Sequence, residues 1–395
     1  MASVVISGAS VAGPALAFWL HRAGHDVTVV ERSTAVRDGG YPIDLRGVAV
    51  DVVERMGLLD AVQAARTDTR QVSFVSGRGR RIGAFTSEVL DGGSWIRAVE
   101  LPRGDLTRIL YEATRQDVEY VFSDSLASLD EDVDGVRVTF ERSAPRTVDL
   151  VVGADGLHSN VRRLAFGPEE SFRRDLGLVY AGFSVPNTFG LEREAVICND
   201  PGRAAALYAV RDLPQVIALL AFASSEVPGR HDVAAQQDLA AAAFADAGWH
   251  VPAVLARMRE ADDFYFDTVS QIRMPEWTRG RVALVGDAGY APSFLSGQGT
   301  SLAVVGAYAL AGELASAPDI AAALPAYERT VRGFVERNQD TADAGGRVIV
   351  PATRGALWRR NAMLRLMPLL ARLGVRDGAD AAASLELADL PVPAG

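Results

Sequence analysis

The sequence predicts an α/β protein in which a parallel sheet with flanking helices is interrupted by an inserted antiparallel sheet and followed by C-terminal helices. Residues 3–31 and 282–314 each begin with an apolar strand that leads through a glycine-containing turn into a helix, as a parallel α/β sheet requires. Between them, residues 172–272 contain the short, turn-bounded strands of an antiparallel sheet. Because 395 residues suffice for two to three domains, we expect the insertion to be a domain of its own.

The N-terminal segment has the pattern of a dinucleotide-binding βαβ unit. An apolar strand at 3–7 leads into a Gly-x-Ser-x-x-Gly turn made of Gly8, Ser10, Val11, Ala12 and Gly13. This is a Rossmann opening in which Ser10 replaces the central glycine, and its small residues let a pyrophosphate approach the backbone. Glu31 ends the second strand, with Arg32 beside it, where a carboxylate meets ribose hydroxyls. Since Glu31 would repel a 2′-phosphate, the sequence predicts bound FAD or NAD rather than NADP.

A second strand–turn–helix unit lies near residue 155. The apolar strand at 148–153 places Asp155 and Gly156 at its end, and Ser159 is a natural N-cap for the next helix. Arg162 stands in the first turn of that helix. An ordinary structural turn is the alternative interpretation, but Asp155 together with Arg162 favours a role in cofactor binding.

The segment 279–299 predicts a backbone cradle for a flat, hydroxyl-bearing ligand. A carboxylate at the end of the strand 282–285 can accept hydrogen bonds from a sugar or ribityl chain. The glycines let the main chain approach a ring closely, and the helix that begins near Thr300 presents free N–H groups. The residues of this cradle are Gly286, Asp287, Pro292, Gly297, Gln298 and Gly299.

Two arginines are further candidates for contact with an anionic ligand. Arg46 lies in a polar loop, where it either neutralises an anionic ring or pyrophosphate or forms a surface ion pair. Arg103 lies near the start of a helix, where a cation opposes the helix dipole unless an anion is close by. We therefore expect Arg103 to contact a phosphate or a carbonyl group.

The domain boundaries follow from the change in pattern along the chain. We expect a cofactor-binding domain from 1–70, 99–170 and 273–345, and a substrate-binding domain from 71–98 and 171–272. Residues 346–375 include a basic amphipathic helix, which either bridges the two domains or lies on a membrane surface, and bridging is the favoured interpretation. The acidic, alanine-rich tail at 376–395 has the composition of a poorly ordered segment.

Aromatic residues of the inserted domain are candidates for a substrate pocket, although such residues also fill ordinary cores. They are Phe183, Tyr208 and Phe222, to which the loop residue Phe294 is added; Tyr180 belongs to the same pattern. No nucleophile–histidine–aspartate arrangement has a local motif, and no histidine pair has the spacing of metal ligands, so we expect no metal.

Bulk properties exclude several other classes of protein. The net charge of −10, without a concentrated basic patch, argues against a nucleic-acid surface. The single cysteine, Cys198, excludes intrachain disulfides and cysteine-based zinc clusters. We see neither a signal peptide nor an apolar run long enough to span a membrane, and we therefore expect a cytoplasmic protein, either a monomer or a homodimer.

Together, Gly8-x-Ser10-x-x-Gly13 with Glu31, Asp155-Gly156 with Arg162, and Gly286-Asp287 with Gly297-Gln298-Gly299 resemble the class A FAD-dependent aromatic monooxygenases, which have the para-hydroxybenzoate hydroxylase fold. The resemblance extends to about residue 375 and is nearest to the two-domain tetracycline-inactivating and antibiotic-tailoring members. It implies that the first motif and Glu31 hold the ADP half of FAD. It further implies that Arg103 and Asp287 contact the middle of FAD, that the Gly-Gln-Gly segment lies beside the isoalloxazine, and that Asp155 and Arg162 serve FAD and the pyridine nucleotide.

The activity implied by the resemblance is hydroxylation of an aromatic or polyketide-like small molecule. NAD(P)H reduces FAD, and the reduced flavin reacts with molecular oxygen to form a C4a-hydroperoxide that transfers one oxygen atom. A flavin dehydrogenase or reductase of the same fold and a non-catalytic, flavin-containing drug-binding protein are the alternatives. Two departures from the family pattern bear on oxygen transfer: Tyr290 replaces a common histidine, and Phe294 replaces a common proline.

Overall fold

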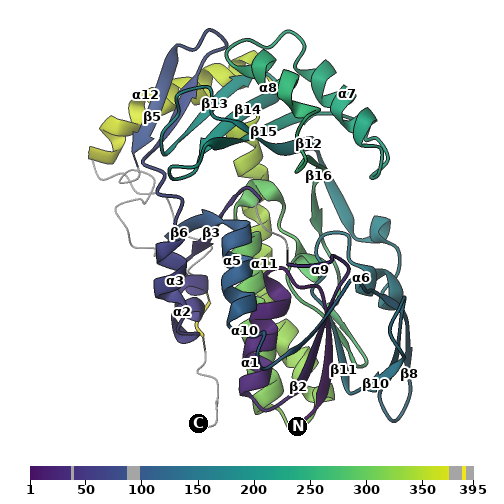
Figure 1. Ribbon diagram of the computed structural model, residues 1–395. Coiled ribbons are helices and arrows are strands. Elements are labelled where there is room, and N and C mark those ends of the chain that lie inside the picture. Colours follow the sequence, from purple (N-terminus) through teal and green to yellow (C-terminus); the bar gives the residue numbers. More distant parts are fainter. Residues whose placement is uncertain (37–39, 87–97, 373–384, 388–395) are drawn as a thin grey trace.

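The computed structural model describes residues 1–36, 40–86, 98–372 and 385–387, and it confirms the predicted α/β fold. Two sheets form two bodies stacked one above the other, which we call the six-stranded domain and the seven-stranded domain (Figure 1). Of the predicted tail at 376–395, all but residues 385–387 lie outside the described residues, as do residues 87–97 of the predicted range 71–98.

The six-stranded sheet has the order β17-β18-β11-β1-β2-β7. Its centre, β1 (Ser3–Ser7), pairs in parallel with β2 (Asp26–Glu31) and β11 (Leu150–Gly153). The other strands are β7 (Glu119–Phe122), β18 (Val282–Leu284) and the antiparallel edge strand β17 (Thr278–Arg279). The central strands are apolar because helices cover the sheet, and their carboxyl ends meet at the edge where such sheets bind ligands.

Long helices surround this sheet and connect it to the rest of the molecule. Helix α10 (Gly299–Ser316) is buried along most of its length and packs between α1 (Ala12–Arg22) and α11 (Ile320–Ile349). The shorter helical elements are α2 (Val48–Arg55), α3 (Leu59–Ala64), α5 (Arg103–Glu112), α6 (Asn160–Ala165), α9 (Asp287–Tyr290), η1 (Glu169–Ser171) and η2 (Phe294–Ser296). Ser159 caps α6 as predicted, since its hydroxyl accepts a hydrogen bond from the backbone N–H of Arg162.

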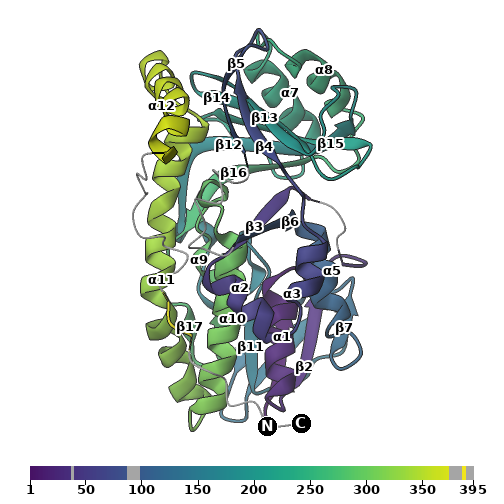
Figure 2. The same cartoon turned by 90° about the vertical axis from the view of Figure 1, so that its left-hand side faces the viewer.

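The seven-stranded sheet has the order β16-β12-β15-β14-β13-β4-β5. Its strands are β4 (Gln71–Val75), β5 (Arg81–Thr86), β12 (Arg173–Pro186), β13 (Glu194–Asp200), β14 (Arg203–Ala209), β15 (Gln215–Ala223) and β16 (Tyr265–Ile272). Helices α7 (Val233–Ala243) and α8 (Val251–Met258) cover its outer face, and the inner face is directed at the six-stranded domain (Figure 2). The sheet thus forms one wall of the space between the two domains.

Smaller elements complete the boundary between the domains. The ribbon of β3 (Pro42–Arg46) and β6 (Ala98–Pro102) lies on the six-stranded domain and below the seven-stranded sheet (Figure 2). A separate sheet contains β8 (Leu126–Glu131), β9 (Val136–Phe140) and β10 (Arg146–Val148). Helix α12 (Arg354–Arg372) follows α11 and packs on β5 and β13. None of the described helices is long and apolar enough to cross a membrane.

Tyr290 is a core residue of the six-stranded domain. Its side chain is fully buried beside Trp277, and its hydroxyl lies 2.9 Å from that of Tyr327, which in turn donates to the carbonyl of Leu284. An added Cβ at Gly306 in α10 would lie 1.9 Å from the Tyr290 hydroxyl oxygen. Tyr290 therefore fixes the distance between the Gly-Asp turn and α10, and its departure from the family pattern is accommodated by glycine on the facing helix.

This contact predicts the outcome of a double-mutant cycle. An exposed Gly→Ala change inside a helix stabilises a protein by about 1 kcal/mol, but Gly306→Ala should destabilise this one by about 2 kcal/mol through overpacking. In a Tyr290→Phe background the nearest remaining ring atom, Cζ, lies 3.2 Å from the added methyl, so the cost of Gly306→Ala should largely disappear. Urea unfolding of the four proteins measures this coupling, and an equal cost in both backgrounds would contradict it.

Candidate functional site

The turn after β1 requires glycine at two positions. Gly8 has a φ of 109°, and a Cβ there would lie 2.5 Å from the carbonyl oxygen of Ala154. A Cβ at Gly13 would lie 1.9 Å from the carbonyl oxygen of Gly8. The turn is therefore packed against the end of β11 and against the first turn of α1, in which Val11 and Ala12 are buried. This close approach leaves the α1 N-terminus free to face a phosphate.

Glu31 holds the loops on either side of this turn. Its carboxylate accepts hydrogen bonds of 2.9 Å from the backbone N–H groups of Ala9 and Ser33. Arg32, next to it, is exposed. Glu31 thus stands at the carboxyl end of β2, where the sequence predicts the ribose contact, and the adjacent main chain already fixes its orientation.

Asp287 and Arg103 define the middle of the cradle. Asp287 is half-buried, and its carboxylate has neither a hydrogen bond nor an ion pair with any described residue. Burial raises the pKa of Asp287, while the positive charges of Arg103 and Arg162 oppose that rise. The Arg103 guanidinium is exposed and donates to the Ser10 hydroxyl over 3.0 Å, so it joins the glycine turn to the Asp287 side of the site.

The loop between α9 and α10 is held in a constrained conformation. Gln271 donates to the carbonyl of Pro292, and Gln339 donates to the carbonyls of Tyr290 and Ala291. Ser293 has a φ of 88°, which is costly for a residue with a side chain. These contacts make the loop rigid although Phe294 stands where the resembled family has proline. Strained backbone of this kind commonly marks a ligand site.

The end of the same loop contains a hydrogen-bond acceptor that has no donor. Gly297 adopts the left-handed conformation, with a φ of 64°. The next residue, Gln298, has a buried Oε1 atom without a donor at the N-terminus of α10. A Cβ added to Gly299 would meet Asp287 and Pro292, and one added to Gly286 would press on Ala12 and Ala303. The cradle therefore joins β18, α1 and α10 around a small-residue surface.

These residues fit FAD. The glycine turn and Glu31 would hold the ADP half, the unpaired carboxylate of Asp287 would accept from ribityl hydroxyls, and Arg103 would contact the polar centre of the cofactor. The Gly297–Gly299 segment would lie along the ring, with the Gln298 side chain as a polar partner. The unmet Oε1 of Gln298 and the unpaired Asp287 are the two observations on this structure that support the fit.

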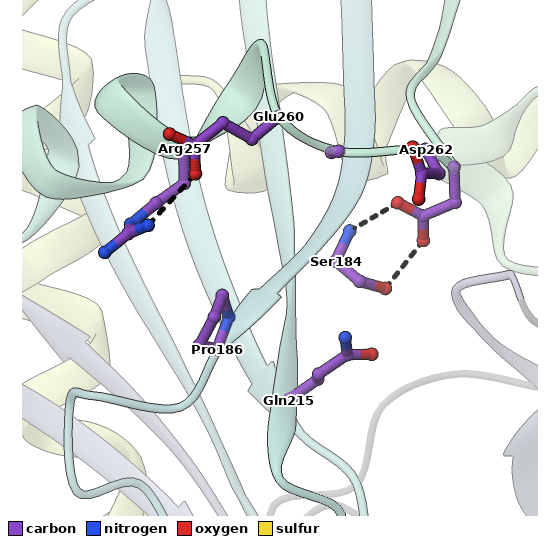
Figure 3. Close-up of a pocket in the computed structure, with 8 residues that line it drawn as sticks. Ser184, Pro186, Gln215, Arg257, Glu260 and Asp262 are labelled. Atoms are coloured by element: carbon purple, nitrogen blue, oxygen red, sulfur yellow. Dashed lines mark hydrogen bonds and ion pairs between the residues drawn. The ribbon is translucent and has the colours of Figure 1, made fainter.

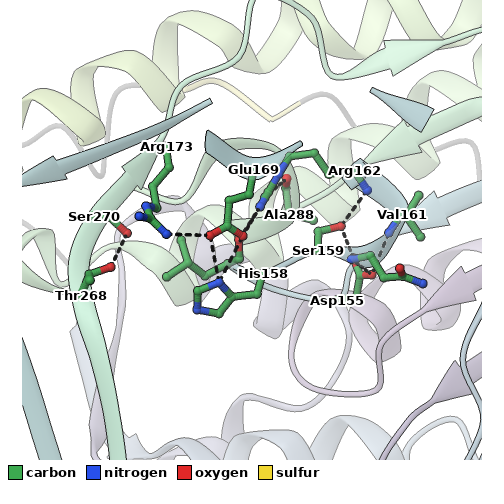
Figure 4. A network of polar contacts seen from close by, with 12 residues as sticks. Asp155, His158, Ser159, Val161, Arg162, Glu169, Arg173, Thr268, Ser270 and Ala288 are labelled. Atoms are coloured by element: carbon green, nitrogen blue, oxygen red, sulfur yellow. Dashed lines mark hydrogen bonds and ion pairs between the residues drawn. The ribbon is translucent and has the colours of Figure 1, made fainter. Parts of the chain in front are cut away.

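Asp155 and Arg162 both take part in contacts within the protein. Asp155 caps α6 by accepting from the backbone N–H groups of Asn160 and Val161 and from the Ser159 hydroxyl (Figure 4). Arg162 is completely buried, donates to the carbonyl of Ala288 over 2.9 Å and forms a 2.8 Å ion pair with Glu169. The prediction that Arg162 contacts FAD or the pyridine nucleotide is therefore wrong, because its guanidinium is enclosed by protein.

The same network contains residues that the sequence did not single out. His158 lies 3.0 Å from Glu169 through Nδ1 (Figure 4). Its Nε2 lies 3.0 Å from the carboxylate of Asp267 in β16. Tyr265 donates to Asp267 over 2.6 Å. Burial opposes protonation of His158, but the two carboxylates outweigh it and raise its pKa. His158 therefore joins the six-stranded domain to the seven-stranded sheet, and no local motif marks contacts between positions 109 residues apart.

The inner face of the seven-stranded sheet has a partly exposed apolar region. It consists of Ile197, Ala206, Tyr208, Ile217 and Leu219, which we call the interdomain floor. Cross-strand pairing aligns Ile197 with Ala206, Ala206 with Leu219, and Tyr208 with Ile217. Residues at the centre of a sheet are normally covered, so their exposure shows that the space above them is open. Tyr208, one of the predicted substrate residues, is part of this floor.

Phe183 and Phe222 lie on the opposite face of that sheet. They are 1% and 2% exposed and belong to the core beneath α7 and α8, where Phe183 contacts Phe264 and Phe222 contacts Phe244. Their prediction as substrate residues is wrong, because the two-residue period of a strand directs them away from the interdomain floor. The sequence did not show which face was covered by helices.

Phe294, in the loop between α9 and α10, packs against the inner face of the seven-stranded sheet. Its ring stacks on Tyr180, with centroids 4.7 Å apart, and meets the edge of Tyr41 at 5.3 Å. The ring centroids of Tyr180 and Tyr265 are also 5.7 Å apart. This aromatic group closes the β12–β16 end of the space between the domains.

The β3–β6 ribbon contributes charged groups to the same space. Asp44 and Glu100 are directly opposite each other, and Arg46 donates to Asp44 over 2.9 Å, so the ion-pair interpretation of Arg46 is the one that the structure shows. Burial and the nearby charge of Asp44 raise the pKa of Glu100 to about 7, although Thr67 donates to its carboxylate. The charges of Glu100, Asp44 and Arg46 all act on Tyr208 of the interdomain floor. The ribbon therefore faces that floor.

A separate hollow of about 400 Å³ lies on the seven-stranded domain, and none of the predicted site residues lines it (Figure 3). Its lining includes Ser184, Gln215 and Arg257 together with acidic residues. The backbone N–H and the hydroxyl of Ser184 donate hydrogen bonds to the carboxylate of Asp263. Among the described residues no group of histidine, cysteine and carboxylate side chains has the arrangement of a metal site. The hollow therefore has no part in the candidate site.

Comparison with known proteins identifies the family of the chain. The FAD binding domain family matches residues 1–342. A flavin-dependent monooxygenase from an unknown prokaryotic organism is 41% identical over 338 residues, which are 85% of this chain and 87% of that protein. An uncharacterized protein of Mycobacterium tuberculosis is 50% identical over 342 residues, 86% of this chain and 92% of that one. The crystal structure of tetracycline destructase Tet(55) is 36% identical, covers 98% of both chains and superposes with a TM-score of 0.84.

The chain therefore belongs to the FAD binding domain family and is an FAD-dependent monooxygenase. The resemblance to class A flavoprotein monooxygenases is confirmed, as is FAD as the cofactor.

The unpaired carboxylate of Asp287 predicts a loss of cofactor affinity on substitution. Asp287→Ala should weaken FAD binding by about tenfold or more, because hydrogen bonds to a charged acceptor are worth about 1.5–3 kcal/mol. Titration of apoprotein with FAD, followed by flavin fluorescence, measures the change. Asp60→Ala, at an exposed position in α3, is the control, and equal FAD affinity in both variants would exclude this role for Asp287.

The His158 contacts predict a pH-dependent contribution to stability. The pKa of His158 is raised in the folded state above the ordinary value of 6.5, so its contribution is complete below that value and is lost as pH rises through the folded-state pKa. The stability difference between the wild type and His158→Gln should be larger at about pH 6 than at about pH 9, by about 1 kcal/mol. Urea unfolding measures it. The exposed His231→Gln control should show no such change, and a constant difference for His158 would refute the prediction.

Proposed function

We propose that this protein uses NAD(P)H and molecular oxygen to hydroxylate an aromatic or polyketide-like small molecule held between its two domains. The observation that carries the proposal is the adjacency of two features. The loop that follows Asp287 packs through Phe294 and Leu295 against Tyr180, Ala204 and Ala221 of the seven-stranded sheet, and the partly exposed interdomain floor lies on the same face of that sheet. The similarity to Tet(55), a tetracycline destructase, supports a polycyclic substrate. We further propose that the protein acts in the cytoplasm as a monomer or homodimer.

The residues of the chain have separate tasks in this proposal. When bound, FAD supplies the oxygen activation that NAD(P)H and molecular oxygen drive in this class of enzyme. The rigid loop that carries Phe294 orients the substrate ring, and the stacked Tyr180 excludes water from that end of the space. The floor around Tyr208 provides the apolar surface that a flat substrate covers.

Glu100 is the residue best placed to accept a proton from a substrate hydroxyl. It faces the floor from the β3–β6 ribbon, and an ionised hydroxyl makes an aromatic ring more electron-rich and easier to hydroxylate. The pKa of about 7 matches that of an efficient general base near neutral pH. Arg46, on the same ribbon, balances the negative charge that the transfer creates on the substrate.

The function is tested by measuring NADPH and NADH consumption in air by the FAD-loaded protein. Phenolic, anthraquinone and tetracycline compounds form the panel, and product masses are recorded. Substrate-stimulated consumption with a product heavier by one oxygen atom is the expected result. Stimulated consumption with a product that gains no oxygen would favour the dehydrogenase or reductase, and tight binding without consumption would favour the drug-binding protein.

The role of Glu100 predicts a pH profile. Because Glu100 is a base only when ionised, the rate of the wild type should rise with pH through about 7. Glu100→Gln should lower the maximal rate by about a hundredfold and remove this rise. The exposed Glu192→Gln serves as the control and should retain the wild-type profile. A Glu100→Gln enzyme with an unchanged profile would eliminate Glu100 as the base.

A further inference from the structure

Two buried glutamines, Gln271 and Gln339, hold three consecutive carbonyl groups of the loop between α9 and α10, and we call them the glutamine pair. Nε2 of Gln339 donates to the carbonyl oxygens of Tyr290 and Ala291 over 3.2 and 3.3 Å. Nε2 of Gln271 donates to the carbonyl oxygen of Pro292 over 3.1 Å. The two glutamines are 0% and 4% exposed, so donors within the protein satisfy these carbonyls away from solvent.

The two glutamines come from different parts of the fold and are bonded to each other. Gln271 belongs to β16 of the seven-stranded sheet, and its Nε2 donates to the backbone carbonyl of Gln339 in α11 over 2.7 Å. Gln339 in turn donates over 2.8 Å to the carbonyl of Ile272, the last residue of β16. The backbone N–H of Ile272 donates to the carbonyl of Ala291. The end of β16, helix α11 and the start of the loop thus share one set of hydrogen bonds.

The loop that the glutamine pair holds forms one side of the cofactor cradle. A Cβ added to Gly299 would lie 3.4 Å from Oδ1 of Asp287 and 3.9 Å from Cδ of Pro292, so these residues are neighbours. Ser293, with its φ of 88°, comes directly after Pro292. A residue with a side chain keeps such a conformation only where the surrounding structure fixes it. The glutamine pair supplies the contacts before Ser293, and the hydrogen bond from the Leu295 N–H to the Ser293 hydroxyl supplies one after it.

The end of the loop contacts the elements that carry the glutamine pair. Phe294 stacks on Tyr180 of β12, and β12 pairs with β16, which contains Gln271. Leu295 packs on α11, where a Cβ added to Gly346 would lie 3.0 Å from its side chain. The loop is therefore attached at its beginning and at its end, and its position depends on both domains.

We propose that Gln271 and Gln339 are positioning residues for the cofactor, because their hydrogen bonds hold the loop so that Asp287 and the Gly297–Gly299 segment keep the spacing that FAD requires. Gln271 belongs to the sheet that bears the interdomain floor, so the same bonds keep the cofactor and the floor at a fixed separation. Each glutamine acts through the main chain of residues 290–292. The proposal concerns the cofactor side of the site and does not depend on which molecule is hydroxylated.

The test replaces each amide by a side chain of similar length that has no N–H donor. Gln339→Met removes the donor to three carbonyls, and Gln271→Met removes the donor to two. Titration of the apoprotein with FAD should show an affinity lower by about tenfold or more in each variant, because the released loop must be ordered again on binding. The visible circular dichroism of the bound flavin should change, and amide hydrogen exchange at residues 290–299 of the apoprotein should become faster.

Gln237→Met is the matched control. Gln237 of α7 is 7% exposed and donates to the carbonyl of Met258 over 3.2 Å, so this variant loses a buried amide donor on the outer side of the seven-stranded sheet. It should lower the melting temperature, as the loss of a buried hydrogen bond does, and leave FAD affinity, the flavin signal and loop exchange as in the wild type. Gln271→Met, which keeps the donors of Gln339, decides the test if Gln339→Met does not fold.

Two outcomes would overturn the proposal. One is wild-type FAD affinity in the variants of the glutamine pair. The other is an equal loss of affinity in Gln237→Met, which would assign these glutamines a general structural role. FAD affinity is measured without substrate, so failure of the positioning role is distinguishable from failure of the proposed hydroxylation.

Discussion

The close approach of the backbone at Gly8 is the constraint on which the rest of the structure depends. No side chain fits there, because a Cβ at Gly8 would lie 2.5 Å from the carbonyl oxygen of Ala154, and a Cβ at Gly13 of α1 would lie 1.9 Å from the carbonyl oxygen of Gly8. The turn therefore brings the ends of β1 and β11 and the start of α1 within contact distance, and Gly286 does the same for β18 and α10. Four segments distant in sequence meet at one point, and the free N–H groups and the Asp287 carboxylate of the cofactor cradle gather there.

Buried polar groups lie in two different environments where the two domains meet. His158, Glu169 and Asp267 form a satisfied network that crosses from the six-stranded domain to β16 and holds the two bodies in register. Glu100, at a border of the interdomain floor, lies opposite another acid, Asp44, in the β3–β6 ribbon.

Sequence reasoning was most successful where function follows from short-range patterns. The α/β class and the Ser159 cap follow from patterns within single segments of the chain, and glycines at fixed offsets mark the residues that are predicted to hold FAD. It failed for Arg162, whose local pattern suited a ligand contact but whose partner Glu169 lies in another element. It also failed for Phe183 and Phe222, because an apolar strand buried on both sides does not indicate which face meets the ligand.

The sequence by itself determined the family and the cofactor, and it predicted the residues of the cradle, because the close contacts of a glycine turn must be encoded where they occur. Only the tertiary structure decided which side chains surround the substrate space. Glu100 meets Asp44 across a ribbon, and His158 meets Asp267 between domains. These contacts join positions 56 and 109 residues apart along the chain, and their chemistry arises from burial and neighbouring charge, which no local pattern records.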